Sequence, residues 1–482
     1  MRIPTILPKP ATMASLFLVG AAVASCFVLA YFLYQYTWTG RQFGSFRGPV
    51  LYYILPATSA LVFFSSLRLK PLYRTRLAIL CGSLGVAAYV ADVFLSALQK
   101  AAWGEVTKSR KQEVLNLAKQ YGVDFDTRDN TEVIADLRKR GVEAVPQIIL
   151  PMLEQQADGT MMSRIHIRGV ETATLGGIAK TVTVMCSQSG RYVIYTTDEH
   201  GFRNPEGMWN AAPLEIAAVG NSFAQGYCVP SDKDFVSLLR KQHPATLNLG
   251  MAGEGPLLML AAISEYLVEL RPKIVLWCYF DGDHLMDLQN EKRSPLLRRY
   301  IDPGFSQRLS VRQKEIDRAL WNYIENAEKL RIATQKPEQH KMLGQLVAHI
   351  KLSQLREKFG MLDNKEALEA ANELKGSTTD LFQKVLLQAK SRVESWGGKL
   401  YFVYLPSWAR YATNNPGIVA MQRSKILNFV KDANVPLVDL HPAFQAHSDP
   451  LSLFPFRRFH HYNEKGHQLV AQEILKPISS TN

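Results

Sequence analysis

The segment "EIAAVGNSFAQGYCVP", residues 215–230, decides the fold of the second half of the chain. Its small and apolar residues are typical of a buried β-strand, which ends at Gly220, and Ser222 follows two residues later. Gly226 comes four residues after Ser222 and allows a second tight turn. The segment is therefore either an ordinary strand-to-helix turn or a turn that presents Ser222 as a nucleophile.

Four further apolar runs follow this segment, and helical patterns separate them. The five runs are "EIAAVG", "TLNLG", "KIVLWCYF", "KLYFVYLP" and "VPLVDL". Their hydrophobicity is continuous rather than alternating, which is typical of a parallel sheet that helices cover on both faces. We therefore predict an α/β domain over residues 214–482, with a polar helical insertion at about residues 290–390.

The first hundred residues carry three long apolar runs, Thr12–Tyr34, Val50–Leu67 and Leu77–Leu98. Each is close to the ~20 residues that a helix needs to span a bilayer. The first run is too long for the apolar part of an ordinary cleaved signal peptide, and two more runs follow it. The sequence therefore predicts three transmembrane helices within residues 1–100.

Lysine and arginine predict the orientation of these helices. Residues 68–76 hold four basic side chains, whereas the loop between the first two runs holds only Arg41 and Arg47. The positive-inside rule then places the N-terminus in the cytoplasm and everything after about residue 100 outside. We expect a multi-pass protein of a bacterial inner membrane with its C-terminal domain in the periplasm.

Residues 101–213 read as a helical neck followed by a mixed accessory region. The formal net charge of +13 is spread along the chain without a nucleic-acid-binding motif, so we expect no nucleic-acid partner. An anionic glycan or membrane surface would suit this charge, as would general solubility. Of the five cysteines, Cys186 and Cys228 either form a disulfide or stay unpaired. None has metal-ligand spacing, so we expect no metal.

Residues with chemical potential gather at the predicted strand ends, where open α/β sheets place their sites. Ser222 follows the first strand, the glycine-rich "NLGMAGEGP" (248–256) the second, and "YFDGDHLMDL" (279–288) the third. A fourth segment, "FHHYNEKGHQLVAQEIL" (459–475), places histidines before and at the start of the last predicted helix. We expect these segments to meet at one edge of the sheet.

Taken together, these four segments resemble the conserved blocks of the SGNH/GDSL hydrolase family. The resemblance covers residues 214–480 and implies a flavodoxin-like, three-layer domain with a parallel sheet. The residues that match the four blocks are Gly220, Asn221, Ser222 and Phe223; Asn248, Gly250 and Gly253; Gly282, Asp283 and His284; and His461, Asn463, Gly466 and His467.

The resemblance implies acyl transfer without a cofactor. Ser222 would be the nucleophile and His461 its base, with His460 as a competing choice. The N–H groups of Ser222 and Gly253 would stabilise the oxyanion, and Asp283 stands where the family has an asparagine that does the same. An ionised Asp283 would repel an oxyanion, so it must be protonated, turned away or not catalytic.

The triad acid departs from the family pattern, because Arg458 and Phe459 occupy the positions where the family has its acid. Asp449 is our predicted substitute. Asp439, or a Ser222–His461 dyad oriented by a backbone carbonyl, remains an alternative.

The sequence thus predicts a membrane-anchored serine esterase or O-acyltransferase that acts on acetyl esters of a cell-surface or exported polysaccharide. Its partners would be the acylated glycan and a membrane protein that donates the acyl group. Three alternatives remain. Ser222 is a mere turn residue, the domain keeps the fold but has lost or weakened catalysis, or the protein is a non-catalytic glycan-binding or assembly component of an export system. Trp408 and Tyr411 either stack on sugars or pack in the core.

Overall fold

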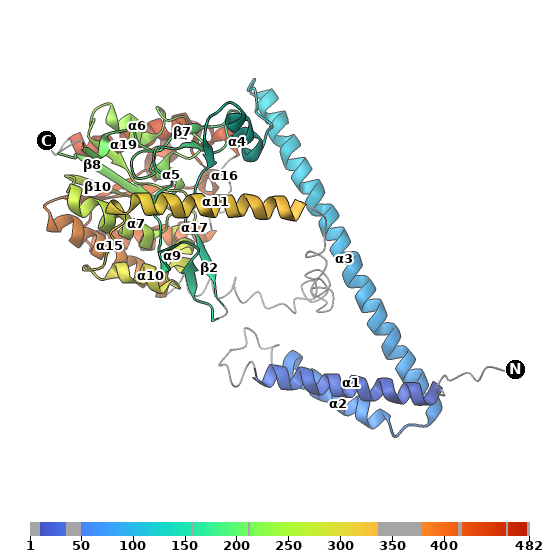
Figure 1. Ribbon diagram of the computed structural model, residues 1–482. Helices are drawn as coiled ribbons and strands as arrows, with labels where there is room; N and C mark the ends of the chain where they lie inside the picture. The colour runs from blue at the N-terminus through green and yellow to red at the C-terminus, as the bar shows by residue number, and fades with distance from the viewer. Residues whose placement is uncertain are drawn as a thin grey trace. The chain divides into compact units, whose positions relative to one another are not determined.

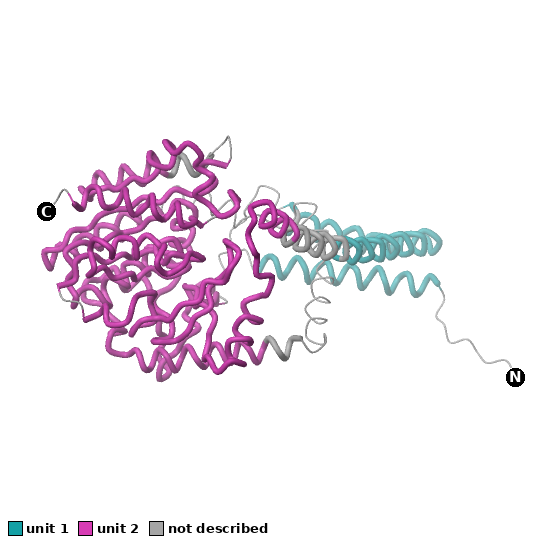
Figure 2. The backbone as a smooth tube through the Cα atoms, turned by 90° about the horizontal axis from the view of Figure 1, so that it is seen from above, with its two compact units in different colours: residues 1–110, 336–371 teal, residues 111–335, 372–482 magenta. Residues whose placement is uncertain are grey.

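A computed structural model describes residues 10–34, 50–156, 158–210, 213–335, 377–412, 417–458 and 461–479. The chain forms two compact units, shown in different colours in Figure 2. The first holds residues 1–110 and 336–371, and the second holds residues 111–335 and 372–482. The residues predicted to carry chemistry all belong to the second unit. His460 and residues 336–376 of the predicted insertion lie outside the described residues.

The described part of the first unit is formed by helices rich in apolar residues, and the last of them, Pro71–Gln120, continues into the second unit. Two of them, Pro10–Leu33 and Pro71–Ser96, are long and apolar enough to cross a membrane. The middle predicted span is helical too, but its apolar helix, Tyr52–Ser66, is shorter than the ~20 residues that a helix needs to span a bilayer. The third predicted span and the predicted neck form one continuous helix. The elements are α1 (Pro10–Leu33), the π-helical η2 (Val50–Ile54), α2 (Leu55–Ser66) and α3 (Pro71–Gln120).

A five-stranded sheet forms the centre of the second unit (Figure 1), and all of its neighbouring strands are parallel. Each strand lies in one of the five predicted runs, so the predicted α/β fold with a parallel sheet is confirmed. The spatial order is β12-β11-β10-β8-β9. The strands are β8 (Ile216–Gly220), β9 (Thr246–Asn248), β10 (Ile274–Phe280), β11 (Lys399–Leu405) and β12 (Leu437–Asp439).

Successive side chains of each strand point to opposite faces of the sheet, and both faces are buried. In β10, Trp277 belongs to one hydrophobic core and its neighbour Cys278 to the other. This double burial explains why the runs are continuously apolar. Helices that contribute to the first core are α7 (Pro256–Ala262), α11 (Gln313–Gln335), α15 (Ser377–Ser395) and α17 (Gly417–Asp432). Those of the second are α5 (Ser222–Gln225), α6 (Phe235–Arg240), α18 (His441–Ala446) and α19 (Glu464–Ser479).

The region before β8 packs into the same unit through short strands. The segment "TVTVMCSQSGRYVIYTTD" forms two antiparallel strands around a turn, β6 (Val182–Val184) and β7 (Ile194–Thr196). The strands of this region are β1 (Ala144–Pro146), β2 (Leu153–Gln155), β3 (Met161–Ser163), β4 (His166–Ile167), β5 (Val170–Glu171), β6 (Val182–Val184) and β7 (Ile194–Thr196).

Shorter helices connect these elements. They are α4 (Asn130–Lys139), η3 (Met208–Asn210), η4 (Ile263–Leu267), α8 (Val268–Leu270), α9 (His284–Glu291), α10 (Pro295–Arg298), η5 (Arg299–Ile301), η6 (Leu309–Val311), α16 (Ala409–Ala412), η7 (Pro450–Leu453) and η8 (Pro455–Arg457).

The strand order determines where a ligand site should lie. Starting from β9, the strands lie in the order β9-β8-β10-β11-β12. The chain therefore runs from β8 toward one edge of the sheet for β9 and toward the other edge for β10, so the direction of winding changes between β8 and β10. Doubly wound sheets bind ligands at this switch point, outside the carboxyl ends of the strands. Ser222 follows β8 and Asp283 follows β10, so both lie at the switch point.

Candidate active site

Tight packing around Gly220 presents Ser222 at the end of β8. A Cβ on Gly220 would lie 2.9 Å from the Cβ atoms of Ala224 and Cys278, so only glycine fits here. Asn221 then caps α5, because its side chain accepts the N–H of Phe223 at 3.0 Å. Ser222 is therefore the first residue of a short helix that leaves the strand abruptly.

His461 meets Ser222 from the far end of the chain. Its Nε2 lies 2.9 Å from the Oγ of Ser222, within hydrogen-bond distance. The imidazole lies between the rings of Phe223 and Tyr227, with each pair of ring centroids 4.9 Å apart. Asn463 anchors the segment, since its Nδ2 donates to the carbonyl of Ser452 at 2.8 Å.

Gln188 takes the place in which the family pattern has an acid. Its side-chain amide contacts the Nδ1 of His461, with Nε2 at 3.0 Å and Oε1 at 3.2 Å. The predicted Asp449 is not beside the imidazole, because its carboxylate pairs with Arg457. Asp439 pairs instead with Arg423.

The amide can serve the histidine in one of two ways. If Oε1 of Gln188 accepts the Nδ1–H of His461, Nε2 is free to accept the Ser222 proton. If the amide NH₂ donates to Nδ1, Nε2 carries the proton and His461 cannot act as the base. A neutral amide also gives a histidine cation less stabilisation than a carboxylate does. The site is thus a Ser–His pair with a weaker third member.

A disulfide holds Gln188 near Ser222. Cys186 and Cys228 are joined, with Cα atoms 5.3 Å apart, which settles the alternatives left open by the sequence. Cys186 lies two residues before Gln188, and Cys228 lies shortly after α5. The bond therefore ties the β6–β7 loop to the helix that Ser222 begins. Closing a loop of this kind stabilises a fold by about 2–4 kcal/mol.

We expect Gln188→Leu to lower kcat for an activated acetyl ester by about tenfold to a hundredfold, because the imidazole loses its orientation. Gln188→Glu should keep or raise kcat and raise the pKa of His461, since a carboxylate stabilises the imidazolium. The acid limb of the pH–rate profile should then move to higher pH. A Gln188→Leu variant with the full wild-type rate would rule out this role.

Arg203 supports the serine helix from the mixed accessory region. Its Nη1 donates to the carbonyl oxygens of Gln225, at 3.2 Å, and Gly226, and its Nη2 donates to that of Val229 at 2.5 Å. Gln225 is the last residue of α5 and Gly226 is its C-cap, so Arg203 places a cation at the C-terminal end of the helix, which suits the helix dipole. No sequence pattern indicates this contact, because it joins segments more than 20 residues apart.

Asp283 faces the site from the end of β10. Its Oδ1 accepts the Nδ2–H of Asn221 at 3.0 Å, which places the carboxyl next to the residue before Ser222. Burial raises the pKa of Asp283 to about 6, despite the hydrogen bond from Asn221. Gly253, the other predicted oxyanion donor, has φ +81° and fits tightly under Leu150, whose carbonyl oxygen would lie 1.6 Å from an added Cβ.

Three more buried carboxyls lie on α9 and the glycine-rich loop. Burial raises the pKa of Asp287 to about 8 and that of Glu291 to about 7. It raises the pKa of Glu254 well above the usual range, and the charge of Glu291 adds to this effect. Glu291 accepts the N–H groups of Gly255 at 2.9 Å and Leu257 at 2.8 Å, so it caps α7 from a different helix.

Asp287→Asn should raise the thermal midpoint of the second unit at pH 8 and leave it unchanged at pH 4. Burial raises the pKa of Asp287 in the folded protein to about 8, so it keeps its proton up to that pH, whereas the unfolded chain releases it near the ordinary pKa of 3.8. Stability from this group is therefore present below pH 4 and lost as pH rises toward 8. Melting the full chain at both pH values, beside the exposed Asp432→Asn control, checks this. Equal shifts at both pH values would contradict it.

Potential metal-ligand atoms gather at one place among the described residues, where Asp283, His284 and Asp287 lie within 4.8 Å of one another. The Nδ1 of His284 already accepts the N–H of Phe280 at 3.1 Å. His467 is similar, since its Nδ1 accepts the N–H of Phe235 at 3.3 Å. Burial lowers the pKa of both histidines to about 3, which fits the structural roles expected for them.

The two candidate sugar-stacking residues are held by neighbouring protein groups. The Nε1 of Trp408 donates to the carbonyl of Arg457 at 2.9 Å. The Oη of Tyr411 lies 2.9 Å from Nδ1 of His441, and its ring stacks on Phe444. Both pack against the second core, which favours the core-packing alternative.

No family model and no curated protein matches the chain. Solved structures with some likeness include a member of the lipolytic G-D-S-L family from Veillonella parvula, 13% identical at a TM-score of 0.30, which covers 55% of this chain and 98% of its own. An acetyl xylan esterase is 10% identical at a TM-score of 0.30, and the match covers 55% of this chain and 100% of the esterase. A two-domain esterase active on acetylated mannans is 13% identical at a TM-score of 0.30, and the match covers 55% of this chain and 49% of that esterase. We draw no functional conclusion from likenesses of this size.

Proposed function

We propose that the protein is a membrane-anchored serine esterase or O-acyltransferase that acts on acetyl esters of a cell-surface or exported polysaccharide. The observation that carries this proposal is the 2.9 Å contact between Ser222 Oγ and His461 Nε2 at the switch point of the sheet. A serine hydroxyl is a poor nucleophile without an adjacent base, and the position of His461 supports that role for its imidazole. The four segments that resemble the SGNH/GDSL blocks supply the prior expectation of this chemistry.

The proposed reaction has two steps. Ser222 Oγ attacks the ester carbonyl carbon while its proton moves to Nε2 of His461. The tetrahedral intermediate collapses to an acyl-serine, and His461 returns the proton to the departing alcohol. Water or a second hydroxyl group then attacks the acyl carbon while His461 takes its proton. The bond from that carbon to Ser222 Oγ breaks and His461 returns the proton to Oγ, which gives hydrolysis in the first case and transfer in the second.

Stabilisation of the oxyanion would come from the N–H groups of Ser222 and Gly253. Asp283 contributes a third donor only while it is protonated, which its pKa of about 6 allows below that pH. Above that pH its carboxylate accepts the Asn221 amide and adds a negative charge beside the reacting carbonyl. We therefore assign Asp283 a donor role in its protonated form.

Two observations support anchoring and periplasmic placement. The first unit holds two helices long enough to cross a membrane and a shorter apolar helix between them. The loop at residues 68–76 carries four basic side chains, more than the loop between the first two apolar runs. The disulfide in the second unit suits an oxidising compartment. A reporter fused to the C-terminus that is active only in the cytoplasm would overturn this placement.

The function is tested by incubating the full chain, in detergent, with an acetylated polysaccharide and an unacetylated acceptor glycan. Free acetate indicates hydrolysis, and acetyl groups on the acceptor indicate transfer from the glycan. A membrane protein that donates acyl groups would be required if transfer occurs only in native membranes. A protein that binds glycan but neither turns over an activated acetyl ester nor reacts with a fluorophosphonate would be a non-catalytic glycan-binding component instead.

A further inference from the structure

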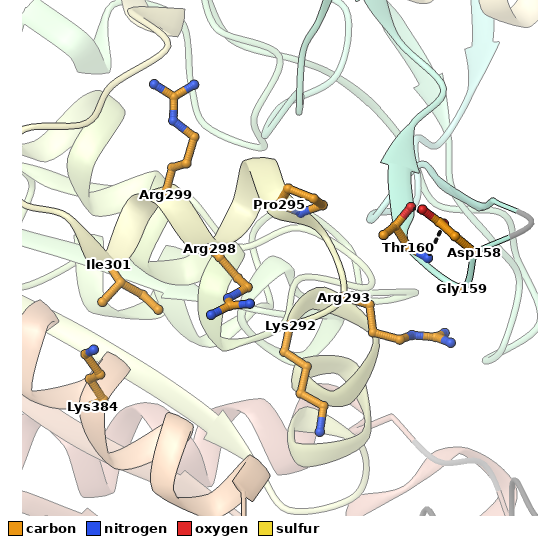
Figure 3. Close-up of a pocket in the computed structure, with 10 residues that line it drawn as sticks. All are labelled: Asp158, Gly159, Thr160, Lys292, Arg293, Pro295, Arg298, Arg299, Ile301 and Lys384. Atoms are coloured by element: carbon orange, nitrogen blue, oxygen red, sulfur yellow. Dashed lines mark hydrogen bonds between the residues drawn. The ribbon is translucent and has the colours of Figure 1, made fainter. Parts of the chain in front are cut away.

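A hollow of about 660 Å³ in the second unit is lined by five cations and by none of the proposed catalytic residues (Figure 3). Its walls come from the β2–β3 turn, from the segment around α10 and from α15. This volume falls in the range of ~300–1,000 Å³ that is common for ligand sites. We call it the cation pocket, and its basic residues are Lys292, Arg293, Arg298, Arg299 and Lys384.

Four of these five cations have no carboxylate partner among the described residues. Asp158, the acid in the lining, accepts the N–H and the Oγ1–H of Thr160 at 2.9 and 2.7 Å. Within the described ranges of the chain, no carboxylate pairs with Arg293, Arg298, Arg299 or Lys384. Arg299 lies over the ring of Phe305 at 4.0 Å instead. The pocket thus keeps a positive potential that attracts anions from solution.

The arrangement of the charged ends indicates what kind of anion fits. In Figure 3 the ends of Arg298, Lys292 and Lys384 lie apart around the hollow and do not converge on one point. One phosphate group would use convergent donors, whereas separated cations suit charges that repeat along a polymer. Guanidinium groups also bind carboxylates through two parallel hydrogen bonds.

The lining argues against a lipid or nucleic-acid partner. Pro295 and Ile301 are its apolar side chains, which is too little apolar surface to insert into a membrane interface. The described lining residues include no aromatic ring on which a base could stack. A hydrated, charged chain of sugars remains the best match.

We propose that the cation pocket binds a segment of an anionic polysaccharide whose carboxylates pair with Arg298, Arg299 and Lys384. Binding here does not require catalysis by Ser222, so the Ser222→Ala protein should bind equally well. A failure of the proposed esterase function would therefore leave this proposal standing, and the reverse also holds.

The test measures the dissociation constant of oligogalacturonate for the full chain in detergent. The Arg298→Glu/Arg299→Glu protein should bind about tenfold more weakly or worse, because two attractive charges become repulsive. The matched control is Lys314→Glu/Arg318→Glu, which reverses two exposed cations on α11 outside the pocket. This control should stay within about twofold of wild type. Lys384→Glu, a single exposed change on a different helix, should weaken binding as well.

Circular dichroism and the thermal midpoint confirm folding of each variant. Equal losses in the pocket variant and the control would show a general charge effect and overturn the proposal. So would tight binding of a neutral oligoglucan of the same length. The Arg298→Glu/Arg299→Glu protein is also tested on phosphatidylglycerol vesicles. If it lost binding to the vesicles but bound oligogalacturonate as tightly as wild type, the pocket would be a lipid site and the proposal would be wrong.

Discussion

Ser222→Ala is expected to lower kcat for an activated acetyl ester by about 10⁴- to 10⁶-fold, the loss seen when a catalytic serine is removed. The physical reason is that no other hydroxyl shares its position. Ser222 begins α5 at the end of β8, and its Oγ contacts the one imidazole that reaches this edge among the described residues. Steady-state turnover by the full chain measures the effect.

Ser391 supplies the matched control for this change. Ser391 is exposed on α15 and has the same hydroxyl group as Ser222, but it lies outside the proposed active site. Ser391→Ala should therefore keep the wild-type rate. A fluorophosphonate should label wild type and Ser391→Ala but not Ser222→Ala. Undiminished labelling of Ser222→Ala would mean that a different nucleophile reacts and that the proposed mechanism is wrong.

His461→Ala should have the second-largest effect, with a fall in kcat of about 10³- to 10⁵-fold, because the serine then keeps its proton. Combining His461→Ala with Ser222→Ala should cost little more than Ser222→Ala alone, since the two residues act as one unit. Additive losses in the double variant would show that they work independently.

Asp449→Asn distinguishes the sequence-based triad from the observed one. The carboxylate of Asp449 pairs with Arg457 on the surface, and such exposed pairs contribute ~0–1 kcal/mol. The variant should therefore retain nearly the wild-type rate and pH profile. A loss as large as that of His461→Ala would show that Asp449 reaches the imidazole during the reaction.

The sheet could be predicted from the sequence because burial on both faces leaves a direct mark on each strand. Trp277 and Cys278 are adjacent in the chain and enter opposite cores, so the run between residues 274 and 280 has no polar position. The pairing of Ser222 with His461 was also predictable, since parallel strands bring their carboxyl ends to one edge and the last helix begins beside it.

The third member of the site could not be predicted. Gln188 lies in a loop 273 residues before His461, and a glutamine carries no pattern that indicates such a role. Cys186 was the available signal, because a disulfide to Cys228 would bring this loop close to Ser222. The sequence left that pairing open. Asp449 was predicted as the triad acid instead, because it is a carboxylate close to His461 in the sequence.

By itself, therefore, the sequence determined the five strands, the apolar N-terminal helices and the serine and histidine of the site. These follow from local properties: the periodicity of buried residues, the glycine that permits a tight turn, and the direction of parallel strands. The tertiary structure alone decided which side chain orients His461, which groups support the serine helix, and which basic side chains line the cation pocket. Each of these depends on contacts between segments distant in the chain, whose geometry exists only once the cores have packed.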